Sequence, residues 1–171
     1  MAYTVIRTDL MSGTNQLADL VSLRFYDSSE PAEVENGVIV KLEGYEDGQR
    51  EVMKAVAASE SDDLNDCAIV AGVEVMYDER KKNLDEFINE AGKATRGYIP
   101  RSRNIFSVTK EGFVGGTVPA KGDTVGIGTG GKIKKDGTNL GKCIAVETAG
   151  RYTYYVIQIG KTETTATGVG G

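Results

Sequence analysis

The residue pattern with the most specific chemical meaning is a glycine string at positions 126–131, which reads GIGTGG and matches G-x-G-x-x-G. In dinucleotide-binding proteins this string lies between a strand and a helix, so that the helix N-terminus holds the pyrophosphate. Here residues 132–137 follow, and they read as another strand and a turn with no helix. We therefore predict a glycine-rich hairpin and no cofactor.

A second candidate is a group of carboxylates at Glu60, Asp62, Asp63 and Asp66. Hard cations such as calcium prefer several oxygen ligands, which such a loop offers. The spacing departs from the EF-hand loop, because it has neither the glycine at the sixth position nor the closing glutamate. We interpret the segment as a solvated loop with Asx turns and predict no metal.

Nucleophilic catalysis has little support in this sequence. The chain contains no histidine, so a Ser-His-Asp arrangement cannot form, and the most frequent general base and metal ligand are missing. A Ser-Lys pair is compatible with the composition, but no local signature accompanies one. We therefore expect a protein that is not an enzyme.

Basic residues gather around positions 80–103, namely Arg80, Lys81, Lys82, Arg96, Arg101 and Arg103. Contact with nucleic acid is one interpretation, and a solvated rim with salt bridges is the commoner one. The net charge of −5 argues against a nucleic-acid partner, which requires a basic footprint. A third interpretation is a protein interface, where arginine is enriched.

Tyrosines supply further contact candidates near the end of the chain. Tyr152 and Tyr154 fall on one face of a predicted strand, and Tyr155 falls on the other. One face should pack in the core, while the other could stack on a neighbouring subunit, since tyrosine gives a large contact area at small entropic cost.

The elements that must position these residues are mainly strands. Residues 37–43 and 51–58 read as strands joined by a turn at 45–48, where Asp-Gly is a hairpin signal. After a polar loop at 59–66, residues 67–76 read as a long buried strand, bent at Gly72.

One segment carries a helical pattern. Leu84, Phe87, Ile88 and Ala91 recur at helical spacing, Asn83 can cap the start, and the chain reaches a glycine at position 92. We predict a short helix over 83–92 that packs on the neighbouring sheet.

Beyond the link at 98–103 the β pattern resumes. Strands are predicted at 105–109, 113–118, 123–127, 132–134, 142–147 and 152–159. Together with 22 glycines and only 3 prolines, this spacing predicts a mainly β (α+β) protein, built as a small barrel or sandwich with one short helix. We divide the chain into an extended N-terminal arm (1–36), a β block (37–97), a barrel-like or sandwich-like block (98–160) and a flexible tail (161–171).

The cysteines, the N-terminus and the lengths of the apolar runs indicate where in the cell the protein is expected. Cys67 and Cys143 lie in apolar runs and are expected to be buried, reduced thiols. Neither a signal peptide nor an apolar run of membrane-spanning length is visible, so we expect no membrane partner and synthesis in a bacterial cytoplasm.

Several segments resemble small proteins encoded in the head-gene clusters of tailed phages. They are residues 74–87 followed by 89–92, and then 105–109, 122–125, 141–147 and 154–157. The resemblance covers residues 36–160 and implies a decoration, or cement, protein on the capsid surface of the virion. It implies the major capsid protein as partner and self-association as a trimer or another small oligomer. We predict a partner interface at Tyr3, Arg7, Arg101, Arg103 and Tyr154.

Two alternatives remain open. A tail-tube or head–tail connector subunit is also small and β-rich. A trimeric deoxyuridine triphosphatase shares the size, the β content and a glycine-rich C-terminus, here residues 168–171, but its catalytic aspartate-containing strand and turn have no counterpart.

Overall fold

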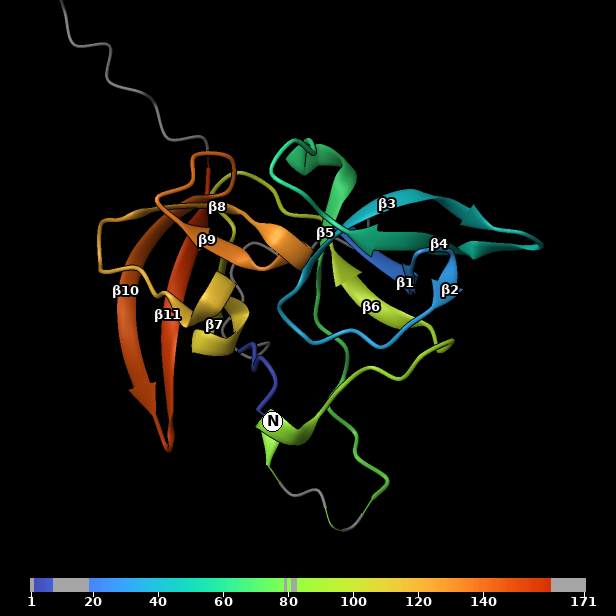
Figure 1. Cartoon of the computed structure of the whole chain (residues 1–171), viewed down its shortest axis with the longest axis horizontal. Helices are drawn as coiled ribbons and strands as arrows, with labels where there is room; N and C mark the ends of the chain where they lie inside the picture. Colours follow the sequence, from blue (N-terminus) through green and yellow to red (C-terminus); the bar gives the residue numbers. More distant parts are fainter. Residues whose placement is uncertain (1, 8–18, 79, 81–82, 161–171) are drawn as a thin grey trace, which may run out of the picture.

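The computed structural model of the chain describes residues 2–7, 19–78, 80 and 83–160 (Figure 1). It is mainly β, as predicted, with a small barrel beside a second sheet. The barrel contains β1 (Leu20–Asp27), β3 (Ile39–Glu46), β4 (Gln49–Ala57), β5 (Cys67–Val70) and β6 (Thr95–Tyr98), with β2 (Glu30–Pro31) paired to β1. The second sheet contains β7 (Ile105–Val108), β8 (Thr124–Ile127), β9 (Ile133–Lys135), β10 (Gly141–Ala149) and β11 (Tyr152–Ile159).

The barrel closes because its first and last strands pair. The strand order is β1-β4-β3-β5-β6, and β6 returns to pair antiparallel with β1. Only the β1–β4 pairing is parallel among these. The second sheet has the order β7-β11-β10-β8-β9 and is antiparallel throughout. Closure removes the open strand edges of the barrel, so partner binding must use other parts of the surface.

Strand β5 lies between two hydrophobic cores, because it is buried on both faces. Ala68 and Val70 point into the barrel interior, where they meet side chains such as Leu23. Cys67 and Ile69 point the other way and pack with the apolar side chains of the second sheet. Successive residues of a strand face opposite sides, so a strand between two cores carries an unbroken apolar run.

The N-terminal arm predicted over residues 1–36 is wrong for much of its length. Residues 20–27 form β1, and Val21, Leu23 and Phe25 line the barrel interior at alternate positions. This alternation is a strand signal, although the same residues also fit an amphipathic turn. Nearer the N-terminus, Ile6 is buried and bridges to Val108. Residues 8–18 and the predicted flexible tail lie outside the described residues.

The helix predicted over 83–92 is also wrong. Only one turn of 3₁₀ helix forms, η4 (Leu84–Glu86), and the backbone is already extended at Phe87. Two residues later Asn89 forms a β-bridge with Val34, exchanging backbone hydrogen bonds of 3.0 and 3.1 Å. Because a helix of two to three turns has little stability of its own, the bridge to the strand-like segment prevails.

Two predicted strands are shorter than expected or absent. The strand predicted over 67–76 ends at Val70, because the chain then leaves the barrel. The strand predicted over 113–118 is replaced in part by a 3₁₀ turn, η6 (Val114–Gly116), in which Gly115 and Gly116 adopt φ of 60° and 68°. The other turns of this type among the described residues are η3 (Leu64–Asp66), η5 (Lys110–Gly112) and η7 (Thr129–Gly131). In the described part of the chain, no helix has the length and apolar character needed to cross a membrane.

Candidate partner-binding surface

The long connection between β5 and β6, residues 71–94, carries the most exposed apolar side chains of the described surface. We call it the 71–94 loop. Val73 is 62% exposed, Val75 is 53% exposed and Tyr77 is 87% exposed. Single exposed apolar residues are ordinary, but three at alternate positions of one segment are typical of an interaction site. We call these three residues the apolar stripe.

The apolar stripe forms one wall of a groove. Residues 87–96 form the opposite wall, where Phe87 and Ile88 add apolar surface. The hollow has a volume of about 430 Å³, and a second hollow of about 260 Å³ continues it past Tyr77 toward Glu33 and Glu86. The groove thus offers apolar contact along its length with charged groups at its rim.

The base of the loop is fixed to the barrel by a buried amide network. Asn36, which is 1% exposed, donates from Nδ2 to the carbonyl of Gly72 at 3.0 Å and accepts the Gly72 N–H at 2.8 Å. Asn89 donates to Asn36 Oδ1 at 2.9 Å and to the carbonyl of Val34 at 2.9 Å. The Thr95 hydroxyl donates to Asn89 Oδ1 at 2.6 Å. Side chains thus supply hydrogen bonds where the chain leaves the sheet.

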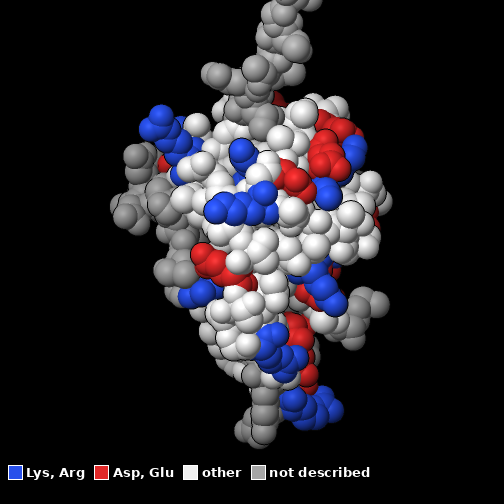
Figure 2. Space-filling view, turned by 90° about the vertical axis from the view of Figure 1, so that its left-hand side faces the viewer, with Lys and Arg blue, Asp and Glu red and all other residues white. Residues whose placement is uncertain are grey.

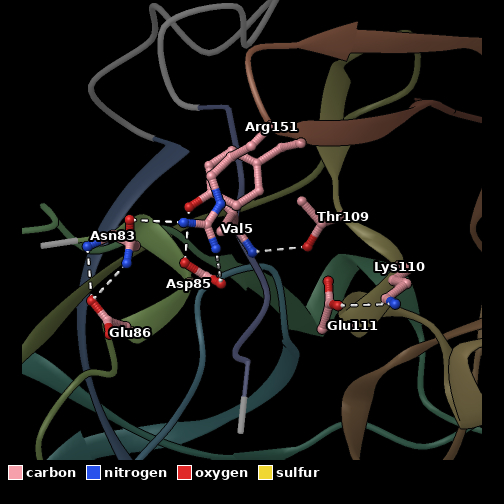
Figure 3. A network of polar contacts seen from close by, with 9 residues as sticks. Val5, Asn83, Asp85, Glu86, Thr109, Lys110, Glu111 and Arg151 are labelled. Atoms are coloured by element: carbon pink, nitrogen blue, oxygen red, sulfur yellow. Dashed lines mark hydrogen bonds and ion pairs between the residues drawn. The ribbon is translucent and has the colours of Figure 1, made fainter. Parts of the chain in front are cut away.

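The far end of the loop is held by Asp85 (Figure 3). Its backbone carbonyl accepts the N–H of Tyr3 at 2.9 Å. Its carboxylate accepts the Tyr152 hydroxyl at 2.9 Å and the Arg151 guanidinium at 3.1 Å. Arg151 also donates to Asn83 at 2.8 Å. Burial raises the pKa of Tyr152, which keeps its hydroxyl protonated as a donor. The turn at η4 is therefore tied both to the β10–β11 hairpin and to the N-terminal segment.

These two attachments hold the apolar stripe between fixed points, about 13 residues apart in sequence from Gly72 to Asp85. A surface segment ordered before binding loses less conformational entropy on association than a free loop does. The arrangement therefore suits recognition of another macromolecule more than it suits a simple connection between two strands.

Three of the five residues predicted to contact a partner lie near this attachment. The guanidinium of Arg7 lies 5.5 Å from the centroid of the Tyr154 ring, in a cation–π contact. Tyr154 is only 4% exposed, and Tyr3 is half-buried beside η4. Their surroundings show that these residues position the hairpin and the 71–94 loop, with little Tyr154 surface left for a partner.

The other two predicted contact residues lie in the link between β6 and β7. This link runs through the upper part of the view in Figure 1, whereas the turn of the β10–β11 hairpin lies in the lower part. Arg101 donates from Nε to the buried carboxylate of Asp19 at 2.6 Å. This hydrogen bond lowers the pKa of Asp19. Arg103 is exposed and adopts a φ of 74°, and its N–H donates to the carbonyl of Ile159. The structure does not bring the five residues into one surface.

A larger hollow of about 920 Å³ lies beside this link, between η3 and the loop before β10. Several of its polar groups already have partners within the chain. Asp62 accepts from Ser59 and pairs with Lys41 at 3.0 Å, while Asp63 caps η3. Asn139 accepts the N–H of Ile127 and donates to the carbonyl of Glu60. The predicted Asx-type loop is therefore held together by its own carboxylates.

The glycine string lies in β8 and η7, and β9 follows it. The strand–turn–strand order agrees with the predicted hairpin. Gly131 adopts a φ of 71°, and an added Cβ there would lie 2.0 Å from the carbonyl oxygen of Ile39. The glycine thus allows the turn to contact β3 closely, where the barrel meets the second sheet.

The face of the molecule opposite the β3–β4 hairpin is shown in Figure 2. Basic and acidic side chains are interspersed there among uncharged residues, and neither sign dominates the view. A face of this kind suits contact through shape and apolar groups more than contact through one strong electric field.

Both cysteines are free thiols in the core. Burial raises the pKa of Cys67 to about 11 and also raises the pKa of Cys143, so both are protonated near neutral pH. A protonated, buried thiol is a poor nucleophile and metal ligand. Over the described residues, no three His, Cys, Asp or Glu side chains are grouped so as to hold a metal ion.

Sequence reasoning missed the apolar stripe, because it placed Val73 and Val75 in a buried strand. The available signal was Gly72, after which Glu74 and Asp78 interrupt the apolar residues. Comparison of the chain with models of protein families, with curated proteins and with solved structures finds no match.

Proposed function

We propose that this protein is a structural component that binds the outer surface of an assembled tailed-phage capsid through its 71–94 loop and stabilises the shell. The observation that carries the proposal is the apolar stripe, which is exposed yet held at both ends by hydrogen bonds. The sequence resemblance to phage head proteins supplies the partner, and residues 74–87, which belong to it, include most of this loop.

The proposed mechanism relies on repetition. A groove of this size gives a weak contact by itself, because stable interfaces usually bury about 800 Å² on each partner. A capsid presents the same site many times, and a small oligomer that engages several sites gains affinity by avidity. A ligand that binds only the assembled shell then stabilises it by mass action.

The N-terminal segment takes a different role from the one expected from the sequence. Ile6 pairs with Val108, and the N–H of Arg7 donates to the carbonyl of Ser107 at 3.0 Å, so residues 6 and 7 extend the chain's own second sheet. We therefore assign capsid contact to the 71–94 loop and not to residues 2–7.

The test combines copy number with a surface variant. Quantitative mass spectrometry of purified particles should give a ratio to the major capsid protein near one or a simple fraction. The double variant Val75→Ser/Tyr77→Ser should fold normally but lose binding to capsid shells that lack the protein. Tyr45→Ser is the matched control. Tyr45 is likewise exposed, at 62%, but it lies in the β3–β4 hairpin, away from the loop.

Other outcomes point elsewhere. A handful of copies per particle would indicate a connector or tail subunit. Absence from particles would refute the virion assignment. Magnesium-dependent hydrolysis of deoxyuridine triphosphate by the protein would then support the enzyme alternative. Capsid binding by the double variant equal to that of Tyr45→Ser would refute the role of the 71–94 loop.

A further inference from the structure

Strand β10 has an edge that is unpaired along much of its length. On one side β10 pairs with β11 from end to end. On the other side β8 pairs with Gly141 and Lys142, and the main chain of Cys143 bonds to residues 122 and 123. Among the described residues, no main-chain group pairs with residues 144–149 on that side. We call this side of residues 144–149 the open edge; it belongs to the hairpin that extends below β8 and β9 in the view of Figure 1.

The main chain of Val146 and Thr148 faces the open edge. The hairpin turns through residues 150 and 151, and a two-residue turn makes the flanking pair, Ala149 and Tyr152, a hydrogen-bonded pair. Such pairs alternate along an antiparallel ladder with pairs that turn their N–H and C=O groups outward. Counting back from the turn, Val146 and Thr148 belong to the outward kind. Their unpaired N–H and C=O groups can therefore pair with the strand of another chain.

Other strand edges carry features that discourage such pairing. Ile6 and Arg7 occupy the outer edge of β7. Strand β9 is only three residues long and includes two lysines, and the tip of the β3–β4 hairpin has charged side chains at five of residues 43–51. The open edge contains neither lysine nor proline, and its one charged residue is Glu147. It therefore lacks most of the protection that natural sheet edges have against pairing.

The side chains of the open edge complement a second copy of themselves. When two copies of one strand pair about a two-fold axis, one residue lies opposite its own counterpart. With Val146 at the axis, residues 144–148 pair, so that Ile144 lies opposite Thr148 and Glu147 lies opposite Ala145. Pairs of β-branched residues stabilise a sheet, whereas Glu147 at the axis would place two like charges directly opposite each other. Ala145 or Thr148 at the axis would pair only residues 144–146 or 147–149 of the open edge.

We propose that two copies of this protein associate through the open edge of β10, as antiparallel strands with Val146 of each copy at the two-fold axis. The second sheets of the two copies then form one continuous sheet. Val146 is 46% exposed, so its contact with its counterpart removes apolar surface from water. The contact involves few residues, which gives weak association with a Kd of about 100 µM. The inference does not depend on the capsid assignment, although a dimer would supply the second site that avidity requires.

Sedimentation velocity of the full-length protein between about 10 µM and 1 mM tests the association. The sedimentation coefficient of the wild type should rise with concentration from that of a monomer toward that of a dimer. Val146→Lys places two like charges at the axis and should weaken the dimer at least about tenfold.

Thr153→Lys is the matched control. It adds the same charge to the same hairpin, but Thr153 is an exposed residue of β11 and lies away from the open edge. It should dimerise as the wild type does, and circular dichroism should show both variants folded. A wild type that stays monomeric at about 1 mM, or equal dimerisation of the two lysine variants, would overturn the inference.

Disulfide cross-linking tests the register. In the proposed pairing the Cα atoms of the two copies of residue 146 lie about 5.5 Å apart, which a disulfide can span. Those of residue 148 lie about 14 Å apart, because each is two residues from the axis. Mild oxidation should therefore cross-link Val146→Cys but not Thr148→Cys, and the native thiols are buried in both. Preferential cross-linking of Thr148→Cys, or none in Val146→Cys, would overturn the proposed pairing.

The outcomes separate this inference from the proposed function. Val75→Ser/Tyr77→Ser should dimerise as the wild type does, because the apolar stripe lies outside the open edge. Capsid shells that bind a strictly monomeric wild type would leave the proposed function standing and refute the dimer, whereas a dimer that binds no shell would do the reverse. A monomeric wild type whose shell binding is abolished by Val146→Lys would overturn the inference in favour of a strand from the capsid protein at the open edge.

Discussion

Asn36 gives the sharpest prediction about what holds the 71–94 loop in place. Asn36→Ala removes the side chain that bonds both backbone groups of Gly72 and accepts from Asn89. Asn36 is 1% exposed, so the groups left behind have little access to water. A buried polar group without a partner costs about 1–3 kcal/mol. Two backbone groups of Gly72, partly rescued by water entry, therefore give a loss of about 3 kcal/mol in the free energy of unfolding.

The assay is urea unfolding followed by far-ultraviolet circular dichroism, with the loss read from the shift in midpoint at constant slope. For a domain of this size the same loss lowers Tm by roughly 6–12 °C. Hydrogen exchange adds a local readout, because the amides of residues 72–78 should exchange faster in the variant than in the wild type. Chymotrypsin should also cleave after Tyr77 more rapidly.

Asn65→Ala is the matched control, since Asn65 is exposed and its side chain donates to the nearby Asp63. It should change stability by less than about 0.5 kcal/mol. A loss below about 1 kcal/mol in Asn36→Ala, or unchanged exchange at 72–78, would refute the idea that this amide fixes the loop.

Three further outcomes follow from other contacts. Arg101→Ala should lower stability at pH 7, because it leaves the buried Asp19 carboxylate without its cation. The hydrogen bond from Arg101 lowers the pKa of Asp19 in the folded protein. The resulting stabilisation is present above the pKa that Asp19 has in the unfolded chain, and it is lost as the pH falls through the pKa in the folded protein. The urea midpoints of the wild type and of Arg101→Ala should therefore converge in acid. Folding raises the pKa of Cys67 from 9.0 to about 11, so the free energy of unfolding should fall as the pH rises between these two values. Cys67→Ala should reduce that fall. An equal fall in the wild type and the variant would show that Cys67 does not cause it. Gly131→Ala should cost about 2 kcal/mol or more in thermal unfolding, because the new Cβ meets the carbonyl of Ile39, and a wild-type Tm would rule out that contact.

The parts of the fold that the sequence predicts best are hairpins with local signals. The β3–β4 turn at Asp47-Gly48 and the β10–β11 hairpin are confirmed, with Gly48 and Gly150 at positive φ. Local alternation and turn residues suffice there, because both strands are adjacent in sequence. The role of residues 20–27 could not be read in the same way, since β1 pairs with β4 and with β6, which are distant along the chain.

The candidate site was not predicted from the sequence for a related reason. Phe87 and Ile88 follow Leu84 at i+3 and i+4, which is helical spacing, and a helix would have buried them on a sheet. Which structure forms depends on Asn89, whose bonds to Val34 and Asn36 span 55 and 53 residues. A polar residue inside an apolar pattern carries no sign of its partner, so sequence reasoning placed Val73 and Val75 in a strand and residues 83–92 in a helix.

Gly72 connects the stability of the barrel to the shape of the proposed binding groove. An added Cβ at this position would lie 2.2 Å from Asn89 Oδ1 and 2.4 Å from Thr95 Oγ1, so the amide network packs directly against a bare backbone. Thr95 begins β6, the strand that closes the barrel on β1, while Val73 begins the apolar stripe. Closing the barrel and fixing the stripe are therefore the same set of contacts. A substitution in this amide network should therefore disturb both the start of β6 and the base of the apolar stripe.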